Sequence, residues 1–368
     1  MIRLSSPNIG EDEIKEVAKV FDSKNLVQGD KVYELEKLVK EYLNVEQAIA
    51  VSSGTAALHL ALIVLGVKPG DEIIVPNFTF PATANVVEIV GAKTILVDVG
   101  IDSLCIDTKI IEDKITNKTK AIIPVHEFGQ CANMDEIMEL AKKYNIHVIE
   151  DAACALGAEY RGKKAGTIGD IGCFSLHPRK SITTGEGGII VTNNSEIANK
   201  LKIIRNHGLD YIEGKPNFVL AGYNYRMTNI QGAIGCVQMK KLDKINDINK
   251  KIATLYNEKI SNIDGVAIPS NKEYGQRIWQ TYHLLLDKKY NRDKIIGKLK
   301  EKNIEANFGA YSVHNQPYYK DKYKYKDEYF KNSIYAYNYG LALPLHGDLK
   351  DSDIDYILKE LERILDEG

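Results

Sequence analysis

The first half of the chain alternates short apolar runs with segments of helical periodicity. The apolar runs read AIAV, DEIIVP, KTILVDV, KAIIPV and HVIED, and the segments between them include TAALHLALIVLGV, PATANVVEIVGA and MDEIMELAKKY. Strands that alternate with helices in this way predict a largely parallel sheet with both faces covered. We therefore expect an α/β fold for this part of the chain.

Two further strand-like runs, GCFSL and GGIIVTN, lead to a long predicted helix, NIQGAIGCVQMKKLDKINDINKKIATLY. Beyond it, TYHLLLD has strand character, whereas NRDKIIGKLKEKN and DSDIDYILKELERILDE have the spacing of amphipathic helices. No tandem repeat or long linker interrupts the chain. The pattern predicts a large α/β domain over residues 1–250, including the N-terminal segment, and a smaller α+β domain over residues 251–368.

Composition narrows the class of protein. The chain has 368 residues, 44% of them hydrophobic, which is enough for two domains, and its formal net charge is -2. Without a basic surplus we expect no nucleic-acid partner, and a small molecule is favoured. The start has no apolar signal core and the apolar runs are shorter than the roughly 18 residues of a membrane helix. We expect a cytoplasmic protein with no membrane contact.

Cysteine and histidine give no sign of a metal site. The five cysteines form no CxxC pair, and the eight histidines show no ligand spacing such as HExxH. Scattered cysteines fit a reducing compartment, where most would be small core residues. We expect no metal.

The stretch VSSGTAALHLAL is a candidate phosphate site. A predicted strand ends at Val51, a turn follows, and Thr55 can cap a helix, so that free N–H groups and the positive helix end point at one spot. An ordinary capped βα turn explains the same residues equally well. Neither GxGxxG nor GxxxxGK[ST] is present, which counts against NAD and ATP.

Asp151 and Lys180 are the other two candidates. Asp151, in HVIEDAACALGA, ends an apolar strand, where open α/β sheets place ligand contacts, although it is also a plausible N-cap. Lys180, in FSLHPRKSITTGEGGIIV, precedes glycines that let backbone crowd against whatever occupies the site. Desolvation and nearby cations would lower its pKa and free the amine as a nucleophile or base, whereas an ordinary surface-loop lysine is the alternative.

Taken together, these three features are the parts needed to hold pyridoxal 5'-phosphate. The helix end takes the phosphate, the aspartate keeps the pyridine nitrogen protonated, and the lysine forms the Schiff base.

The amino-acid sequence of these segments resembles that of the DegT/StrS family of sugar-nucleotide aminotransferases, including its perosamine-synthase-like members. This family consists of pyridoxal-phosphate enzymes of fold type I. The resemblance covers nearly the whole chain and includes DEIIVPNFTFPATANVV, PVHEFGQCANMDEI, GYNYRMTNIQGAIG and LALPLHGDL. The pattern SxHxxKxxTxGEGG is its most specific part. The resemblance implies a mostly parallel, mixed seven-stranded sheet between helices, with a smaller α+β C-terminal domain.

The resemblance also implies roles for single residues. Lys180 would be the Schiff-base lysine and proton shuttle, and Asp151 the partner of the pyridine nitrogen. Phe80 would stack on the cofactor ring, or else be plain core. Phosphate contacts would come from Gly54, Thr55 and Ser175, and from Asn224 of a neighbouring subunit, which implies a homodimer with shared active sites.

One position departs from the family. Many relatives have Gln, His or Glu where this chain has Cys154, and in some that side chain hydrogen-bonds near the ring hydroxyl of the cofactor. Cys154 is retained as a candidate cofactor-binding residue. A thiol is a poor donor and acceptor, so either another group makes this contact or the electronics of the cofactor differ.

Substrate contacts are expected from the C-terminal domain and from arginines. Tyr311 and His314 lie where the family approaches the sugar, although the tyrosine-rich region is equally consistent with domain packing. Arg226 and Arg205 are candidates to meet a carboxylate or diphosphate. His177, beside the lysine, is expected to be a supporting or buried histidine.

The sequence therefore predicts a pyridoxal-phosphate-dependent aminotransferase that moves an amino group from glutamate to a nucleotide-linked ketosugar, with a 4-keto-6-deoxyhexose favoured and pyridoxamine 5'-phosphate as the intermediate form of the cofactor. A sugar dehydratase or an inosose-type aminotransferase is the alternative within enzymes, although dehydratase relatives have His in place of the lysine. A non-catalytic sensor of the same fold is the alternative outside enzymes.

Overall fold

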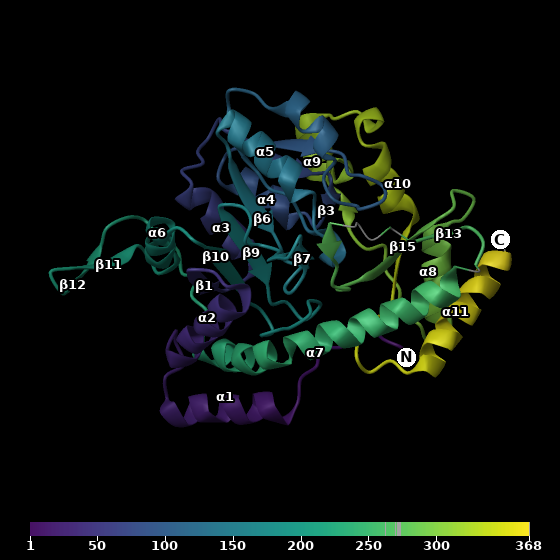
Figure 1. The fold of residues 1–368 in the computed structure, drawn as a ribbon, viewed down its shortest axis with the longest axis horizontal. Helices are drawn as coiled ribbons and strands as arrows, with labels where there is room; N and C mark the ends of the chain where they lie inside the picture. The colour runs from purple at the N-terminus through teal and green to yellow at the C-terminus, as the bar shows by residue number, and fades with distance from the viewer. Residues whose placement is uncertain (262, 269, 271–273, 368) are drawn as a thin grey trace.

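A seven-stranded sheet forms the centre of the large part of the protein (Figure 1). The structure is a computed structural model that describes residues 1–261, 263–268, 270 and 274–367. The strand order is β1-β10-β9-β6-β5-β2-β4, and only β10 runs against the others. The strands are β1 (Gln47–Val51), β2 (Glu72–Pro76), β4 (Lys93–Val97), β5 (Thr119–Ile122), β6 (His147–Asp151), β9 (Ile171–Ser175) and β10 (Gly188–Thr192).

Helices cover both faces of this sheet, as the alternating pattern predicted. Two separate apolar clusters, one on each face, hold the layers together. One face carries α3 (Gly54–Val64), α4 (Ala82–Ile89) and α6 (Ser195–Arg205). The other carries α2 (Asp30–Leu43), α5 (Met134–Tyr144) and the first half of α7 (Asn229–Ile260). The prediction of an α/β fold with a mostly parallel sheet is confirmed.

The C-terminal part has a core of its own. Its apolar cluster joins the end of α7 to a three-stranded antiparallel sheet and two amphipathic helices. These elements are β13 (Val266–Ala267), β15 (Tyr282–Leu286), β17 (Gly340–Leu343), α8 (Arg292–Glu301) and α11 (Asp351–Asp366). The strand at TYHLLLD and both predicted helices are present where the sequence placed them.

The structure differs from the predicted domain boundary in two ways. Helix α7 runs without interruption through residue 250 and contributes to both cores, so the two parts share one helix (Figure 1). The first residues of the chain also belong with the small part. Ile2 pairs with Ile304, and the Leu4 carbonyl accepts a hydrogen bond from Leu345. The side chains of Ile2, Ile304 and Leu345 belong to that apolar core.

Several elements were not predicted from the sequence, although the first of them has the spacing of an amphipathic helix. They include α1 (Glu11–Ser23) below α7, and a hairpin of β11 (Leu209–Ile212) and β12 (Lys215–Phe218) that projects from the body (Figure 1). The tyrosine-rich region forms α9 (Pro317–Tyr323) and α10 (Lys331–Tyr339). Short strands β3 (Phe78–Thr79), β7 (Glu159–Tyr160), β8 (Lys163–Lys164), β14 (Gly275–Gln276) and β16 (Tyr311–Ser312) make small two- and three-stranded sheets.

Short 3-10 turns complete the fold. They are η1 (Thr108–Ile110), η2 (Glu112–Lys114), η3 (Glu127–Gly129), η4 (Val313–Asn315) and η5 (Asp327–Tyr329). Across the described residues, no helix combines the length and the apolar character needed to cross a membrane.

Candidate active site

Asp151 ends strand β6 at the carboxyl edge of the sheet. Its side chain is 5% exposed, and its two oxygens accept hydrogen bonds from the Thr83 hydroxyl at 2.7 Å and from the Ala153 N–H at 3.1 Å. A turn rather than a helix follows, so Asp151 does not act as an N-cap. Burial raises the pKa of Asp151, against the opposing effects of Thr83, Ala153 and the charge of Lys180. The site therefore holds a buried carboxyl that a cationic group would stabilise in its ionised form.

Lys180 lies on the turn between β9 and β10, directly beside this carboxyl edge. The turn is closed by a hydrogen bond from the Lys180 N–H to the His177 carbonyl at 2.9 Å. The Lys180 Nζ donates to the Cys154 Sγ at 3.0 Å, and its charge acts on both Asp151 and Glu127. Lys180 is thus directed into the site rather than to open solvent.

The predicted lowering of the Lys180 pKa is wrong for the cofactor-free protein. Burial does act to lower it, but the acidic groups of Cys154, Asp151 and Glu127 outweigh burial and raise the pKa of the amine. The same burial raises the pKa of the Cys154 thiol. Burial thus favours the neutral thiol of Cys154, whereas the acidic groups around Lys180 favour its ammonium form.

The glycines after Lys180 that lie at the start of β10 pack closely against other parts of the protein. A Cβ at Gly188 would lie 2.3 Å from the Ser53 carbonyl oxygen, and one at Gly187 would lie 2.3 Å from the Thr184 Oγ1. Gly188 lets the start of β10 pass close to the turn that follows β1. The predicted close approach of these glycines to a ligand beside Lys180 remains a prediction.

The turn after β1 presents the start of α3 to the site. Ser53 caps the helix by accepting the Ala56 N–H at 3.1 Å, which leaves the first N–H groups of the helix, at Gly54 and Thr55, directed outward. A Cβ at Gly54 would lie 2.8 Å from the Ser175 Cβ, so only glycine lets the end of β9 approach the helix start this closely. Gly54, Thr55 and Ser175 are therefore brought together as the sequence predicted.

Asn224 and Arg226 lie beside the same turn within one chain. The Ser52 N–H donates to the Tyr225 carbonyl at 2.8 Å, and Arg226 pairs with Val51 through a β-bridge. Asn224 is exposed, and Arg226 donates to Asn206. The contact of Asn224 with a neighbouring subunit remains a prediction.

Phe80 and Tyr311 meet at the rim of the site. Strands β3 and β16 pair, which places the two rings edge to face with their centroids 6.2 Å apart. The Phe80 side chain is 64% exposed, so it is not the core residue that the alternative interpretation required. An exposed aromatic face at this place is free to stack on a planar ligand.

Two other predicted residues are engaged inside the protein. His314 is 2% exposed, stacks on Phe330 at 4.4 Å, and shares short contacts with Asn77 and Ser312. The Arg205 guanidinium donates to Glu36 and to the Ala50 carbonyl, both at 2.6 Å. This geometry favours structural roles for both residues over the expected substrate contacts.

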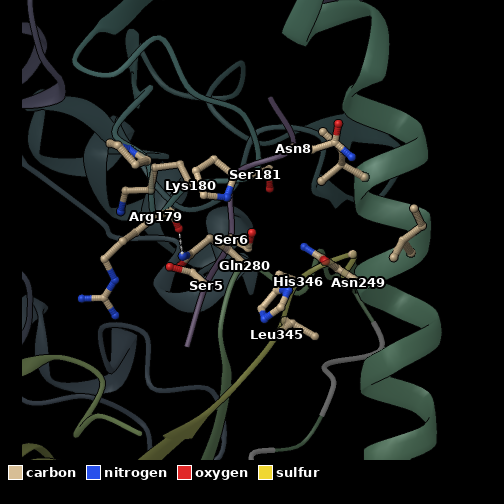
Figure 2. Close-up of a pocket in the computed structure, with 15 residues that line it drawn as sticks. Ser5, Ser6, Asn8, Arg179, Lys180, Ser181, Asn249, Gln280, Leu345 and His346 are labelled. Carbon is tan, nitrogen blue, oxygen red and sulfur yellow. Dashed lines mark hydrogen bonds between the residues drawn. The ribbon is translucent and has the colours of Figure 1, made fainter. Parts of the chain in front are cut away.

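A small cavity of about 40 Å³ is lined in part by the turn that carries Lys180 (Figure 2). Its walls come from the N-terminal segment, the turn itself, α7 and the C-terminal part, and the Gln280 side chain donates to the Arg179 carbonyl at 2.5 Å. The cavity is large enough for water only. Residues of the N-terminal segment and of the C-terminal part therefore lie beside the turn that carries Lys180.

The sequence profile of the DegT/DnrJ/EryC1/StrS aminotransferase family matches residues 7–362. The chain belongs to this family. It is 38% identical over 372 residues to a GDP-perosamine synthase of Caulobacter vibrioides, covering 99% of this chain and 98% of that protein. It is 35% identical over 381 residues to a UDP-4-amino-4-deoxy-L-arabinose--oxoglutarate aminotransferase of Shewanella sediminis, covering 98% of this chain and 97% of that protein.

Solved structures of aminotransferases share the fold of this family member. A putative sugar aminotransferase from Streptococcus pneumoniae in its PMP form has a TM-score of 0.94 and 28% identity, with 100% of both chains covered. Its PLP form has the same TM-score at 29% identity, covering 100% of this chain and 99% of that one. The predictions of the DegT/StrS family, of fold type I and of an aminotransferase are confirmed.

Sequence reasoning missed two residues of the site in this aminotransferase. Thr83 lies inside the quoted NFTFPAT segment and donates to Asp151, but a threonine two residues into a helix gives no signal of its own. Glu127 follows the run KAIIPV at the same sheet edge as Asp151 and is 4% exposed. The rule that ligand groups gather at carboxyl ends of strands applies to Glu127 as it does to Asp151.

Proposed function

We propose that this family member is a pyridoxal-phosphate-dependent aminotransferase that moves an amino group from glutamate to a nucleotide-linked ketosugar. The observation that carries the proposal is the amine of Lys180, held at 3.0 Å from the Cys154 Sγ and acting electrostatically on the buried Asp151. A lysine, a buried acid and a helix start at one sheet edge are the three groups that this cofactor requires.

The residues present fit the cofactor. The outward N–H groups of Gly54 and Thr55, with the Ser175 hydroxyl nearby, suit a phosphate. Asp151 is buried without an ionic partner among its described hydrogen bonds, so a protonated ring nitrogen would relieve the cost of its charge. Phe80 supplies an open aromatic face, and Lys180 the amine.

When bound, pyridoxal phosphate supplies an aldehyde that takes up amino groups and a ring that stores an electron pair. Lys180 would hold the aldehyde through Nζ. Asp151, whose carboxyl accepts a hydrogen bond from the Thr83 hydroxyl, would keep the ring nitrogen protonated. With its amine freed by a substrate amine, the Nζ of Lys180 would move a proton between the nitrogen-bearing carbon of the substrate and the C4' carbon of the cofactor. In the whole reaction glutamate becomes 2-oxoglutarate, and the amino group replaces the keto oxygen of the sugar.

The activities for which the relatives are named support the substrate class. Two of them act on GDP- and UDP-linked amino sugars by name, and one names oxoglutarate as partner. We propose a 4-keto-6-deoxyhexose as the preferred acceptor, and glutamate as the donor. The presence of Lys180 disfavours the dehydratase alternative, whose members lack the lysine.

We also propose a homodimer with shared active sites. Its support is the projecting hairpin, which leaves Tyr211, Ile212 and Phe218 exposed at 67%, 52% and 74%. Large apolar side chains gathered on one projection are typical of a contact surface. The exposed Asn224 follows this hairpin in the chain and would accompany it toward a second subunit.

The substrate test is a panel of nucleotide sugars. Protein loaded with cofactor would be incubated with glutamate and either 4-keto-6-deoxy or 3-keto nucleotide sugars, with products identified by mass. We expect an amino sugar from a 4-keto substrate, with equimolar 2-oxoglutarate. A deoxysugar without an amino group would favour the dehydratase, an aminated inosose alone would favour the inosose-type enzyme, and no product together with no response to glutamate would favour a sensor.

A further inference from the structure

Glu127 is a buried acid that the proposed function has not used. It follows β5 at the point where Val125 pairs with Asp151 and the His126 N–H donates to the Asp151 carbonyl at 3.0 Å. The chain then reverses through η3, with Phe128 in the left-handed region at φ 52°. This register brings Glu127 to the same sheet edge as Asp151, one strand further along.

A row of hydroxyl groups connects the two acids. The Thr79 hydroxyl is near enough to the Glu127 carboxyl to act to lower its pKa, and the Thr79 Oγ1 lies 3.4 Å from the Thr83 Oγ1. Thr83 in turn donates to Asp151. Glu127, Thr79 and Asp151 are each at most 5% exposed. The row is therefore shielded from water, and the two carboxyl groups share one polar environment.

The charged groups around Glu127 are few. Lys180 and Arg277 attract its negative charge, and Asp151 repels it, while Cys154 feels its charge in turn. The His126 ring, next in the chain, is paired with Glu150 at 2.8 Å and lies near enough to Asp151 to act on it electrostatically. Burial raises the pKa of Glu127 to about 8 despite Lys180. At neutral pH Glu127 is a protonated carboxyl that can donate a hydrogen bond.

The order of the strands indicates which edge of the cofactor ring would lie next to Glu127. The phosphate turn follows β1 and Ser175 ends β9, Asp151 ends β6, and Glu127 follows β5 on the far side of β6. In pyridoxal phosphate, the phosphate arm and the ring hydroxyl flank the aldehyde on opposite sides, with the ring nitrogen across from it. A cofactor with its phosphate at Gly54 and its nitrogen at Asp151 therefore turns its hydroxyl toward the β5 side.

We propose that Glu127 is a cofactor-binding residue that donates a hydrogen bond from its protonated carboxyl to the ring oxygen of pyridoxal phosphate. The inference rests on the proposed function. It also accounts for Cys154, which stands where some relatives have a side chain that hydrogen-bonds near the ring hydroxyl. A thiol is a weak donor, so Glu127 would supply that hydrogen bond instead. The carboxyl supplies the strong donor, and the threonine row keeps it in place.

The experiment compares Glu127→Gln, which keeps a donor but cannot ionise, with Glu127→Leu, which removes the donor. Glu13→Gln is the matched control, since Glu13 is a 2% exposed carboxyl held by Lys241 in another part of the protein. The first readout is the visible absorbance of the bound cofactor as a function of pH. A donated hydrogen bond lowers the proton affinity of the ring oxygen. We therefore expect Glu127→Leu to raise the pH midpoint of the absorbance change by about 1 unit, which is a tenfold change in proton affinity.

We expect Glu127→Gln to shift the midpoint by less than Glu127→Leu does, and Glu13→Gln to leave it unchanged. An unchanged midpoint in Glu127→Leu overturns the role of Glu127. A lowered midpoint also overturns it, because it would mean that the wild-type carboxyl is ionised. If the wild type itself gives no visible band with pyridoxal phosphate, the proposed function fails, and this inference fails with it.

The second readout uses cofactor-free protein and does not depend on activity. A carboxyl whose pKa is higher in the folded state binds more protons there, so its contribution to stability is present at acidic pH and is lost as pH rises from about 4.5 toward 8. We expect the melting temperature of Glu127→Gln to fall less than that of the wild type over this range. Parallel curves for the two proteins would show that Glu127 is not protonated at neutral pH and would overturn the proposal.

Discussion

Replacing Lys180 with alanine is expected to reduce amino transfer by more than about 10⁴-fold. The variant loses both the amine that would hold the cofactor and the group that would move the proton, and acid–base catalysis alone contributes about 10²–10⁴-fold. Since the Lys180 side chain forms a hydrogen bond to Cys154 and no ion pair in the described residues, the fold should survive. The measurement is kcat with glutamate and the acceptor sugar, alongside a thermal melt and binding of pyridoxamine phosphate.

The matched control is Lys164→Ala. Lys164 is also partly buried and pairs with Glu159 at 2.8 Å, but it lies on the short strand β8 rather than at the carboxyl edge of the main sheet. It should retain wild-type kcat. Transfer by Lys180→Ala at a rate near that of this control would remove the basis of the proposed function.

The second large loss of kcat is expected when Asp151 is replaced. Asp151→Asn keeps the size of the side chain and its oxygen for Thr83, but it removes the charge that would keep the ring nitrogen protonated. Loss of one aligned electrostatic partner typically costs about 10²–10³-fold in kcat. We expect a loss of that size in kcat, with the cofactor still bound, as measured by steady-state kinetics and by the absorbance of the dialysed protein.

Asp170→Asn is the corresponding control for Asp151. The Asp170 carboxylate accepts the Val148 N–H at 2.8 Å near the other end of the same strand, so it tests the support of β6 without touching the site. A loss of kcat in Asp170→Asn equal to that in Asp151→Asn would mean that strand integrity, rather than the charge of Asp151, explains the effect.

The sequence predicted the regular part of the fold because its signals are local. The runs that became β1, β2, β5 and β6 are apolar and short, and the spacing within α5 and α11 is strongly amphipathic, so burial alone selects their structure. The hairpin of β11 and β12 has mostly exposed residues and no such pattern. The pairing of Ile2 with Ile304 joins residues too far apart in the sequence for any local signal.

The same contrast applies to the site. Asp151, Lys180 and Gly54 could be predicted, because each stands at the junction of a strand with a turn or a helix and belongs to a recognisable motif. The raised pKa of Lys180 could not, since it depends on three acidic groups from separate segments that meet only in the folded chain. His314 was expected to contact the substrate because it lies where the family approaches the sugar, whereas the fold encloses it between Asn77 and Phe330.

The central claim is that Lys180 holds pyridoxal phosphate through its amine. The most direct measurement is borohydride reduction of the protein loaded with pyridoxal phosphate, followed by digestion and mass analysis of the peptides. The account predicts that the cofactor is fixed on one residue, Lys180, and that glutamate added before reduction prevents this labelling. Fixation on a different lysine, or no fixation while the protein still transfers amino groups, would contradict it.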